Sequence, residues 1–133
     1  MNRTPIQIYP TDMAGVNEVL EGIEGAYDLV FLDIAGTLNQ DGIDKVLGQV
    51  HHFFIPVLQD MDTFQSSIEF HQILMEEIVA QSAAFKSCHF FLNNLPFMNQ
   101  AKRYRNLLKE EGAAVLTKPV FHHVIYELSL IHI

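Results

Sequence analysis

The sequence predicts an α/β domain built on a mainly parallel sheet. Short apolar runs of strand length alternate along the chain with longer segments whose apolar residues recur every three or four positions. The run at 28–33 is apolar almost throughout, as in strands that are covered on both faces. Such alternation is typical of βαβ crossovers. We therefore expect about five strands with helices on both faces, as in a Rossmann-like fold.

The first half of the chain holds three predicted strands and two short helices. Thr11 or Asp12 is suited to cap the first helix. Pro56 ends the ladder of the third strand because proline has no N–H. In chain order, we expect a strand at 5–9, a helix at 13–23, a strand at 28–33, a helix at 43–50 and a strand at 53–57.

The second half holds two longer helices, each followed by a strand. Asp60 and Asp62 are candidate caps for the first of these helices, and Gly112 is suited to end the second. We expect a helix at 60–80, a strand at 88–94, a helix at 98–112 and a strand at 113–116. No internal repeat, low-complexity tract or linker interrupts the pattern, which indicates one domain.

Composition indicates a globular protein with a real core. The chain has 133 residues, of which 49% are hydrophobic. No apolar stretch approaches the roughly 20 residues of a membrane helix, and residues 1–10 lack the layout of a secretory signal. We therefore expect a cytoplasmic protein with no membrane partner.

The cysteine and the histidines do not predict a metal site. Cys88 is the single cysteine, so it forms neither an internal disulfide nor a CxxC motif, and we expect it in the core. Two pairs of histidines are adjacent in sequence, at 51–52 and 122–123. Adjacent side chains diverge on a strand and on a helix, so neither pair converges on one ion.

The charged residues are unevenly distributed. A net charge of −8 argues against a protein that coats nucleic acid over its whole surface. However, Lys102, Arg105 and Lys109 share one face of the predicted helix at 98–112. This face is either a solvated helix surface or a local patch that contacts phosphate.

Polar residues follow three of the predicted strands, at the ends where ligands bind in parallel sheets, and those after 53–57 are most simply the helix caps named above. Asp33 ends the run at 28–33, and Gly36 lies three residues later. A carboxylate there can hold Mg²⁺ through water, while glycine lets backbone N–H groups approach a terminal phosphate. Asn93 ends the strand at 88–94, where its amide could read the edge of a base. Ordinary turn chemistry also accounts for these residues.

Four motifs in this order resemble the ParA/MinD family of deviant-Walker P-loop ATPases. They are "YDLVFLDIAGTL", "FFIPVLQDMDTFQSSIEF", "FFLNNLPF" and "AAVLTKPVFHHVIYE". The similarity covers nearly all of residues 5–127 and includes in particular the ParA-like proteins of Bacteroidetes conjugative transposons. The first motif resembles the Walker B strand and switch II, and the third resembles the strand ending in the nucleotide-contacting Asn.

The resemblance implies a SIMIBI-type P-loop fold that binds ATP and Mg²⁺. Asp33 would orient the Mg²⁺ water shell, and Gly36 would sense the γ-phosphate. Asn93 and Pro119 would flank the adenine, which requires Asp33 and Asn93 to open onto the same edge of the sheet.

The resemblance also implies what the intact protein does. It would dimerise face to face across the nucleotide and use ATP hydrolysis in plasmid partition or in maintenance of another mobile element. Its partners would be a partition protein and non-specific DNA, with Lys102, Arg105 and Lys109 as candidate DNA contacts.

The family's phosphate-binding loop has no counterpart in this sequence. Neither GxxxxGK[ST] nor a relaxed version occurs, so we expect this chain alone not to hydrolyse ATP. We expect residues 1–127 to be an N-terminally truncated ParA-like domain. In the family, the strand that leads into this loop lies between the Walker B strand, here 28–33, and the strand at 53–57. Its loss predicts a gap in the sheet or direct pairing of its neighbours.

The last six residues, 128–133, read "LSLIHI". This stretch resembles a translated transposase mosaic end used in sequencing libraries. We therefore expect a non-native tail derived from a sequencing adapter.

Two other classes of protein share some of these features. A Ras-like GTPase needs an NKxD loop to select guanine, and "NNLP" has no such acid. A flavodoxin-like or receiver-like binding module would explain Asp33 without a phosphate loop. Asp12 and Lys118 fit that alternative, although a receiver normally has an acidic pair where only Asp12 is present.

Overall fold

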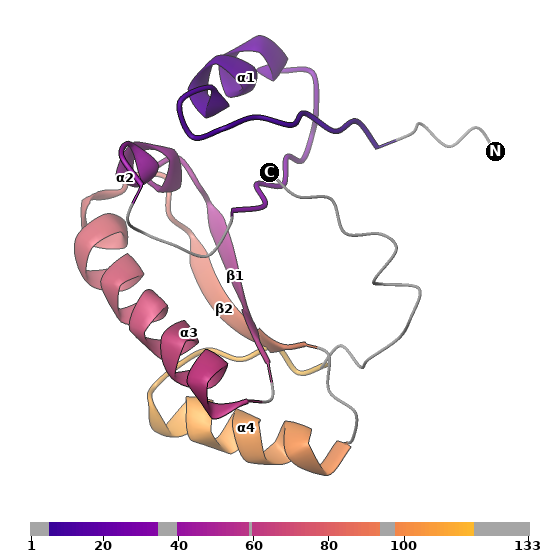
Figure 1. Cartoon of the computed structure of the whole chain (residues 1–133), viewed down its shortest axis with the longest axis vertical. Coiled ribbons are helices and arrows are strands. Elements are labelled where there is room, and N and C mark those ends of the chain that lie inside the picture. The colour runs from indigo at the N-terminus through magenta and orange to yellow at the C-terminus, as the bar shows by residue number, and fades with distance from the viewer. Residues whose placement is uncertain (1–5, 35–39, 59, 94–97, 119–133) are drawn as a thin grey trace, which may run out of the picture.

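The computed structural model describes residues 6–34, 40–58, 60–93 and 98–118, without the side chains of residues 98–100 (Figure 1). Gly36, Pro119 and the expected tail at 128–133 lie outside these residues. The longer elements are α1 (Val16–Ile23), α2 (Ile43–Leu47), β1 (His52–Val57), α3 (Met61–Ile73), β2 (Ser87–Leu92) and α4 (Met98–Glu110). A π-helical turn, η1 (Leu74–Ile78), and a 3₁₀ turn, η2 (Val79–Gln81), follow α3.

The two strands pair in parallel, which confirms the predicted α/β class and strand direction. Their register runs from His52 opposite Ser87 to Val57 opposite Leu92. On the other edge of β2, Phe90 forms a single parallel bridge with Val115, in the segment where the fifth strand is expected. The order across the described sheet is therefore β1, β2 and then the segment around Val115.

The sheet is smaller than predicted, because residues 6–9 and 28–33 form no strand. The run at 28–33 has no regular secondary structure and is largely exposed, with Leu29 at 68% and Phe31 at 77% exposure. The described residues contain no strand against which it is paired. An apolar run without a ladder partner gains no backbone hydrogen bonds, so its composition alone does not make it a strand.

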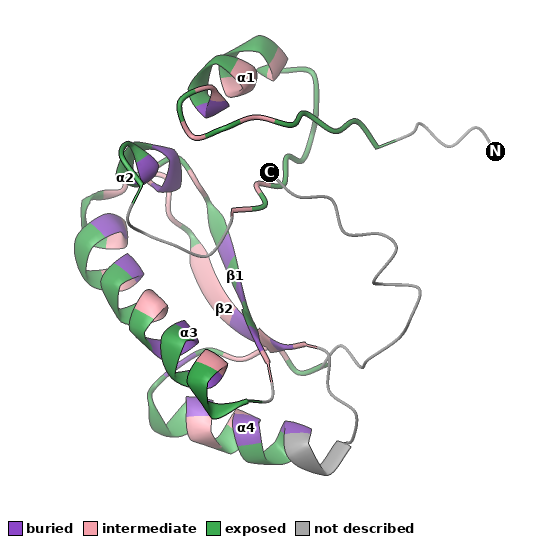
Figure 2. Ribbon diagram, viewed as in Figure 1, coloured by how far each residue is buried: buried purple, intermediate pink, exposed green. Residues whose placement is uncertain are grey.

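The expectation of helices on both faces of the sheet is also wrong for the described residues. Along β1, burial alternates, and Phe53, Ile55 and Val57 face the core. Both α3 and α4 cover this face: Phe64 of α3 and Tyr104 of α4 have ring centroids 5.6 Å apart (Figure 2). Successive right-handed crossovers that advance in one direction across a sheet place their helices on the same side.

Local signals in the sequence identify several element ends correctly. Asp60 caps α3, since its Oδ1 accepts a hydrogen bond of 2.8 Å from the Thr63 N–H. Gly112 adopts a φ of 74° just beyond α4, a left-handed conformation that ends helices at little steric cost for glycine. The long helix predicted at 60–80 is instead α3 followed by η1 and η2.

The N-terminal part lies at one end of the molecule (Figure 1). The chain before α1 and the chain after it are joined by a hydrogen bond of 2.6 Å between the Tyr9 and Tyr27 hydroxyls. None of the helices in the described part of the chain has the length and apolarity that crossing a membrane requires.

Candidate functional site

Asp33 lies on the wall of a cavity of about 280 Å³. Apolar side chains of Met13, Val16 and Ile34 supply much of the wall, and Asp12 supplies a second carboxylate. Asp12 also fixes the entry to α1, because its Oδ1 accepts a hydrogen bond of 2.9 Å from the Gly15 N–H. The cavity is therefore a small, largely apolar recess with two acids on its lining.

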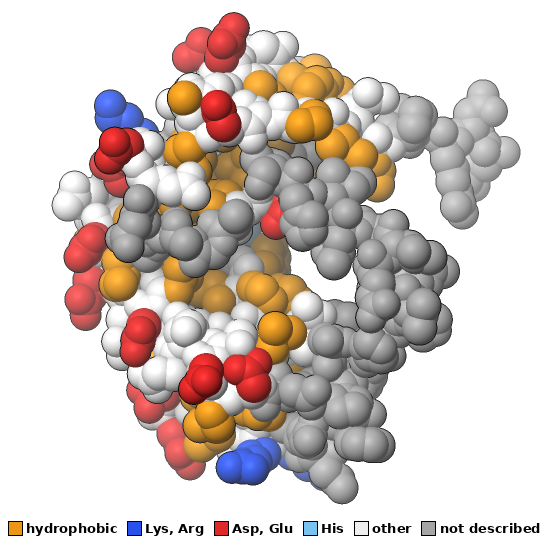
Figure 3. All heavy atoms as spheres, viewed as in Figure 1, with side chains coloured by type: hydrophobic (Ala, Val, Ile, Leu, Met, Phe, Trp, Pro, Cys, Tyr) orange, Lys and Arg blue, Asp and Glu red, His pale blue; other side chains and the backbone are white. Residues whose placement is uncertain are grey.

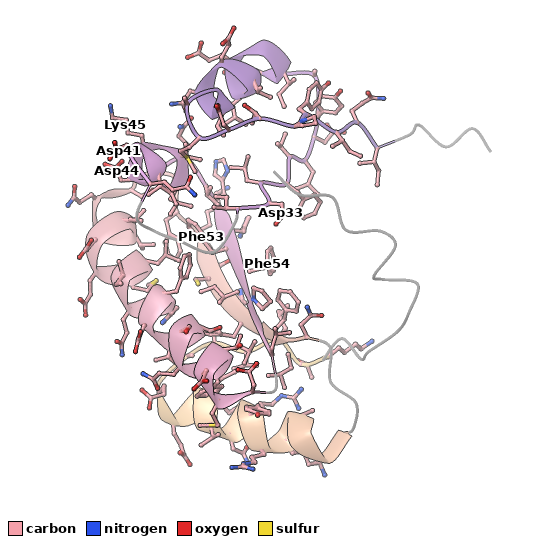
Figure 4. The ribbon with its side chains drawn as sticks, in the orientation of Figure 1. Asp33, Asp41, Asp44, Lys45, Phe53 and Phe54 are labelled. Atoms are coloured by element: carbon pink, nitrogen blue, oxygen red, sulfur yellow. The ribbon has the colours of Figure 1, made fainter. Side chains whose placement is uncertain are left out.

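The structure does not bring Asp33 and Asn93 together. Asp33 shares its cavity with Val46 of α2, the helix that precedes β1, and in the view of Figure 4 it is drawn near Phe53 and Phe54, toward the start of β1. Asn93 follows β2, and its N–H donates to the Val57 carbonyl at 3.0 Å, at the carboxyl end of β1. The two residues thus lie toward opposite ends of a strand that spans about 20 Å. The shared edge that a nucleotide pocket requires is not formed in this structure.

The predicted basic face of α4 is only partly available to a ligand. Lys102 and Lys109 are exposed, and Lys and Arg side chains gather over this helix (Figure 3). Arg105 is half-buried, and its guanidinium donates to the Thr117 carbonyl. Its Nε is buried with no partner among the described residues. Arg105 therefore ties α4 to the segment that follows Val115, while the two lysines remain free to meet phosphate.

The described titratable groups do not form a catalytic constellation. Burial raises the pKa of the Cys88 thiol to about 11, so at neutral pH it is protonated and a poor nucleophile. Burial lowers the pKa of His71, whose ring packs on Phe90 with centroids 4.9 Å apart. Among described residues, no three His, Cys, Asp or Glu side chains are grouped closely enough to hold a metal ion.

A second cavity, of about 670 Å³, lies between α2 and the turns that follow α3. Asp44 and Glu77 contribute to its lining, together with Ile43 and Ile78. The apolar pattern at 60–80 predicts one regular helix and therefore gives no indication of this cavity. No signal in the sequence marked the π-helical turn that shapes this wall.

No family model, curated protein or solved structure matches this chain. Any assignment of function therefore rests on its own residues and geometry.

Proposed function

We propose that this chain is the part of a ParA-type ATPase that follows the phosphate-binding loop. The intact protein would bind and hydrolyse Mg-ATP in the partition or maintenance of a mobile genetic element. One observation carries this proposal: in the described residues the outer edge of β1 has no partner strand, and the Walker B-like run at 28–33 lies outside the sheet. A domain that lacks the strand between these two segments is expected to have both features.

The position of Asp33 follows from the same cause. A strand added along β1 would present its own free edge, with the N–H and carbonyl groups that 28–32 needs to form a parallel ladder. That pairing would carry Asp33 to the carboxyl end of the sheet, where Asn93 already lies against Val57. On this proposal, the chain carries Asp33 and Asn93 but does not bring them together, and it is inactive alone.

The experiment compares this chain with a version extended upstream from the genomic sequence. Hydrogen exchange is measured for both with and without Mg-ATP. We expect protection only in the extended chain, and Asp33→Ala there should abolish Mg²⁺-dependent ATP turnover. Asp44→Ala, which removes an exposed acid in α2, is the control that should retain turnover. Protection of the short chain by Mg-ATP, or turnover by the Asp33→Ala protein, would contradict the proposal.

The exposed lysines of α4 are the proposed contacts to non-specific DNA in the intact dimer. Reversing Lys102 and Lys109 to Glu should weaken DNA binding and flatten its salt dependence. The double variant Lys45→Glu/Lys86→Glu, at two exposed lysines outside α4, is the matched control for the change in net charge. Equal weakening by the control would mean that total charge, and not this helix, governs binding.

A receiver-like binding module is the second candidate, and one observation favours it. Asp12 and Asp33 line the same cavity, as paired acids of a Mg²⁺ site would. Lys118, which such a module would also need nearby, instead follows the segment paired with β2 and does not line this cavity. Mg²⁺ titration of the short chain distinguishes the two. Saturable binding that needs both acids and no nucleotide would favour the module.

A further inference from the structure

The outer edge of β1 presents unused backbone hydrogen-bonding groups. His51 and Val57 direct their carbonyls to β2, where they accept from Ser87 and Asn93. Residues alternate along a strand, so His52, Phe54 and Pro56 direct their backbone groups to the other edge. Within the described residues, no backbone hydrogen bond joins that edge to another segment. The edge therefore offers the N–H groups of His52 and Phe54, and the carbonyls of all three residues.

The composition of β1 is unusual for an exposed edge. Edge strands of soluble proteins are commonly protected by charged side chains, bulges or prolines. β1 reads HFFIPV and carries no Asp, Glu, Lys or Arg. Its one protective feature is Pro56, whose carbonyl already accepts from the Ser67 hydroxyl at 3.2 Å. The half of the strand from His52 to Ile55 is left open, and Phe54 is 51% exposed beside it.

We propose that two copies of this chain associate through this edge, antiparallel about a two-fold axis at Phe54. The Phe54 N–H of each copy would donate to the Phe54 carbonyl of the other. Each His52 N–H would donate to the partner copy's proline carbonyl at position 56. Every N–H on the edge is then satisfied, and proline stands where only an acceptor is needed. A second copy is thus the occupant whose donors and acceptors complement this edge.

Side chains and helices are compatible with this pairing. The two Phe54 rings would lie side by side on the uncovered face, an aromatic cross-strand pair. Helix α3 packs on β1 and also reaches β2 through His71 and Phe90. It therefore lies over the pair of strands, and its symmetry copy would lie about two strand spacings away, roughly 10 Å. Helices in contact pack at about 8–10 Å, so the two α3 helices would adjoin without overlap.

Electrostatic repulsion opposes the association and should make it depend on the salt concentration. α3 carries Asp62 and Glu69 but no Lys or Arg, and the chain has a net charge of −8. Two such helices side by side repel each other at low ionic strength. The dimer is therefore expected to be weak and to strengthen as salt is added.

Sedimentation equilibrium of this chain between about 10 and 300 µM tests the proposal. We expect a monomer–dimer equilibrium that strengthens with added NaCl. Phe54→Lys should weaken it at least about tenfold, because edge charge disfavours strand pairing. Pro56→Val should strengthen it about tenfold, since it adds one donor per copy opposite the free His52 carbonyl. Phe31→Lys, a charge at another exposed phenylalanine, should leave it unchanged.

Each outcome decides the matter. A monomer at every concentration overturns the proposal, as does an open-ended series of larger oligomers. If Phe31→Lys abolishes association and Phe54→Lys does not, then the run at 28–33 mediates the association. That result also overturns the proposal. Should Phe54→Lys lose its circular dichroism signal, the Pro56→Val protein decides alone. No nucleotide enters this test, so its failure leaves the proposed function standing, and the converse also holds.

Discussion

Replacing Phe31 with Ala distinguishes a buried central strand from an unpaired one. Phe31 is 77% exposed, so roughly a quarter of its surface is covered. At about 25 cal/mol per Å² and roughly 200 Å² for a buried phenylalanine, its removal lowers the free energy of unfolding by about 1 kcal/mol at most. A phenylalanine in a strand covered on both faces would instead cost about 3–5 kcal/mol on truncation.

Phe90 provides the matched control. It is 1% exposed in the middle of β2, with strand neighbours on both sides and His71 against its ring. The site has little room to collapse after truncation, so Phe90→Ala should cost about 3–5 kcal/mol. A domain of this size has a total stability on the order of 5–15 kcal/mol, so the loss is a large fraction of it.

Urea unfolding followed by circular dichroism measures both changes. We expect the midpoint of Phe31→Ala to lie close to that of the parent chain and the midpoint of Phe90→Ala to fall sharply. Similar losses in the two variants would mean that the run at 28–33 is buried. That result would refute the reasoning that places it outside the sheet.

Three further predictions follow from local contacts. Asp60→Ala removes the cap on Thr63 and should lower the free energy of unfolding by about 1 kcal/mol. Asp62→Ala, which also removes an acid from the first turn of α3 but no cap, should lower it less, and equal effects would contradict the capping role. Burial lowers the pKa of His71 in the folded state, so neutral His71 contributes fully to stability above its ordinary pKa of about 6.5. This contribution is lost as the pH falls from about 6.5 through the lowered pKa. His71→Phe should therefore flatten the dependence of the urea midpoint on pH in that window. The pKa of Cys88 is raised to about 11, so iodoacetamide should label the folded chain at pH 8 at least tenfold more slowly than the chain in urea. Equal labelling rates would show that the thiolate is accessible in the folded chain.

The sequence predicts the parts of this fold that depend on local signals. The cap at Asp60 and the stop at Gly112 are set by residues within one turn of each helix end. β1 and β2 lie within one or two residues of the predicted strands, and parallel pairing follows from the helix between them. These features need little information from distant residues.

The run at 28–33 shows where such reasoning ends. Its apolar composition indicates a surface that favours burial, but pairing depends on a neighbour that the run does not specify. The position of Asp33 depends on the same missing information, because a residue at the end of a strand is positioned by the partner with which that strand pairs. Asn93 lies at the carboxyl end of the sheet, as the sequence predicts, because β2 has neighbours on both sides. The π-helical turn at Leu74–Ile78 was not predictable for another reason, because its apolar residues keep nearly helical spacing.

The free edge of β1 links the proposed function to the association of two copies, because a strand from upstream and a second copy would occupy the same groups. In a chain extended upstream, the added strand should block the dimer formed through Phe54 and should also give 28–32 a ladder. Phe31→Ala would then cost about 3–5 kcal/mol instead of about 1 kcal/mol, as for a buried strand. Measuring that cost in the short and extended chains, with Phe90→Ala in each as the control, tests this coupling. An extended chain that still dimerises through Phe54, or in which Phe31 remains dispensable, would show that the missing neighbour of β1 does not lie upstream.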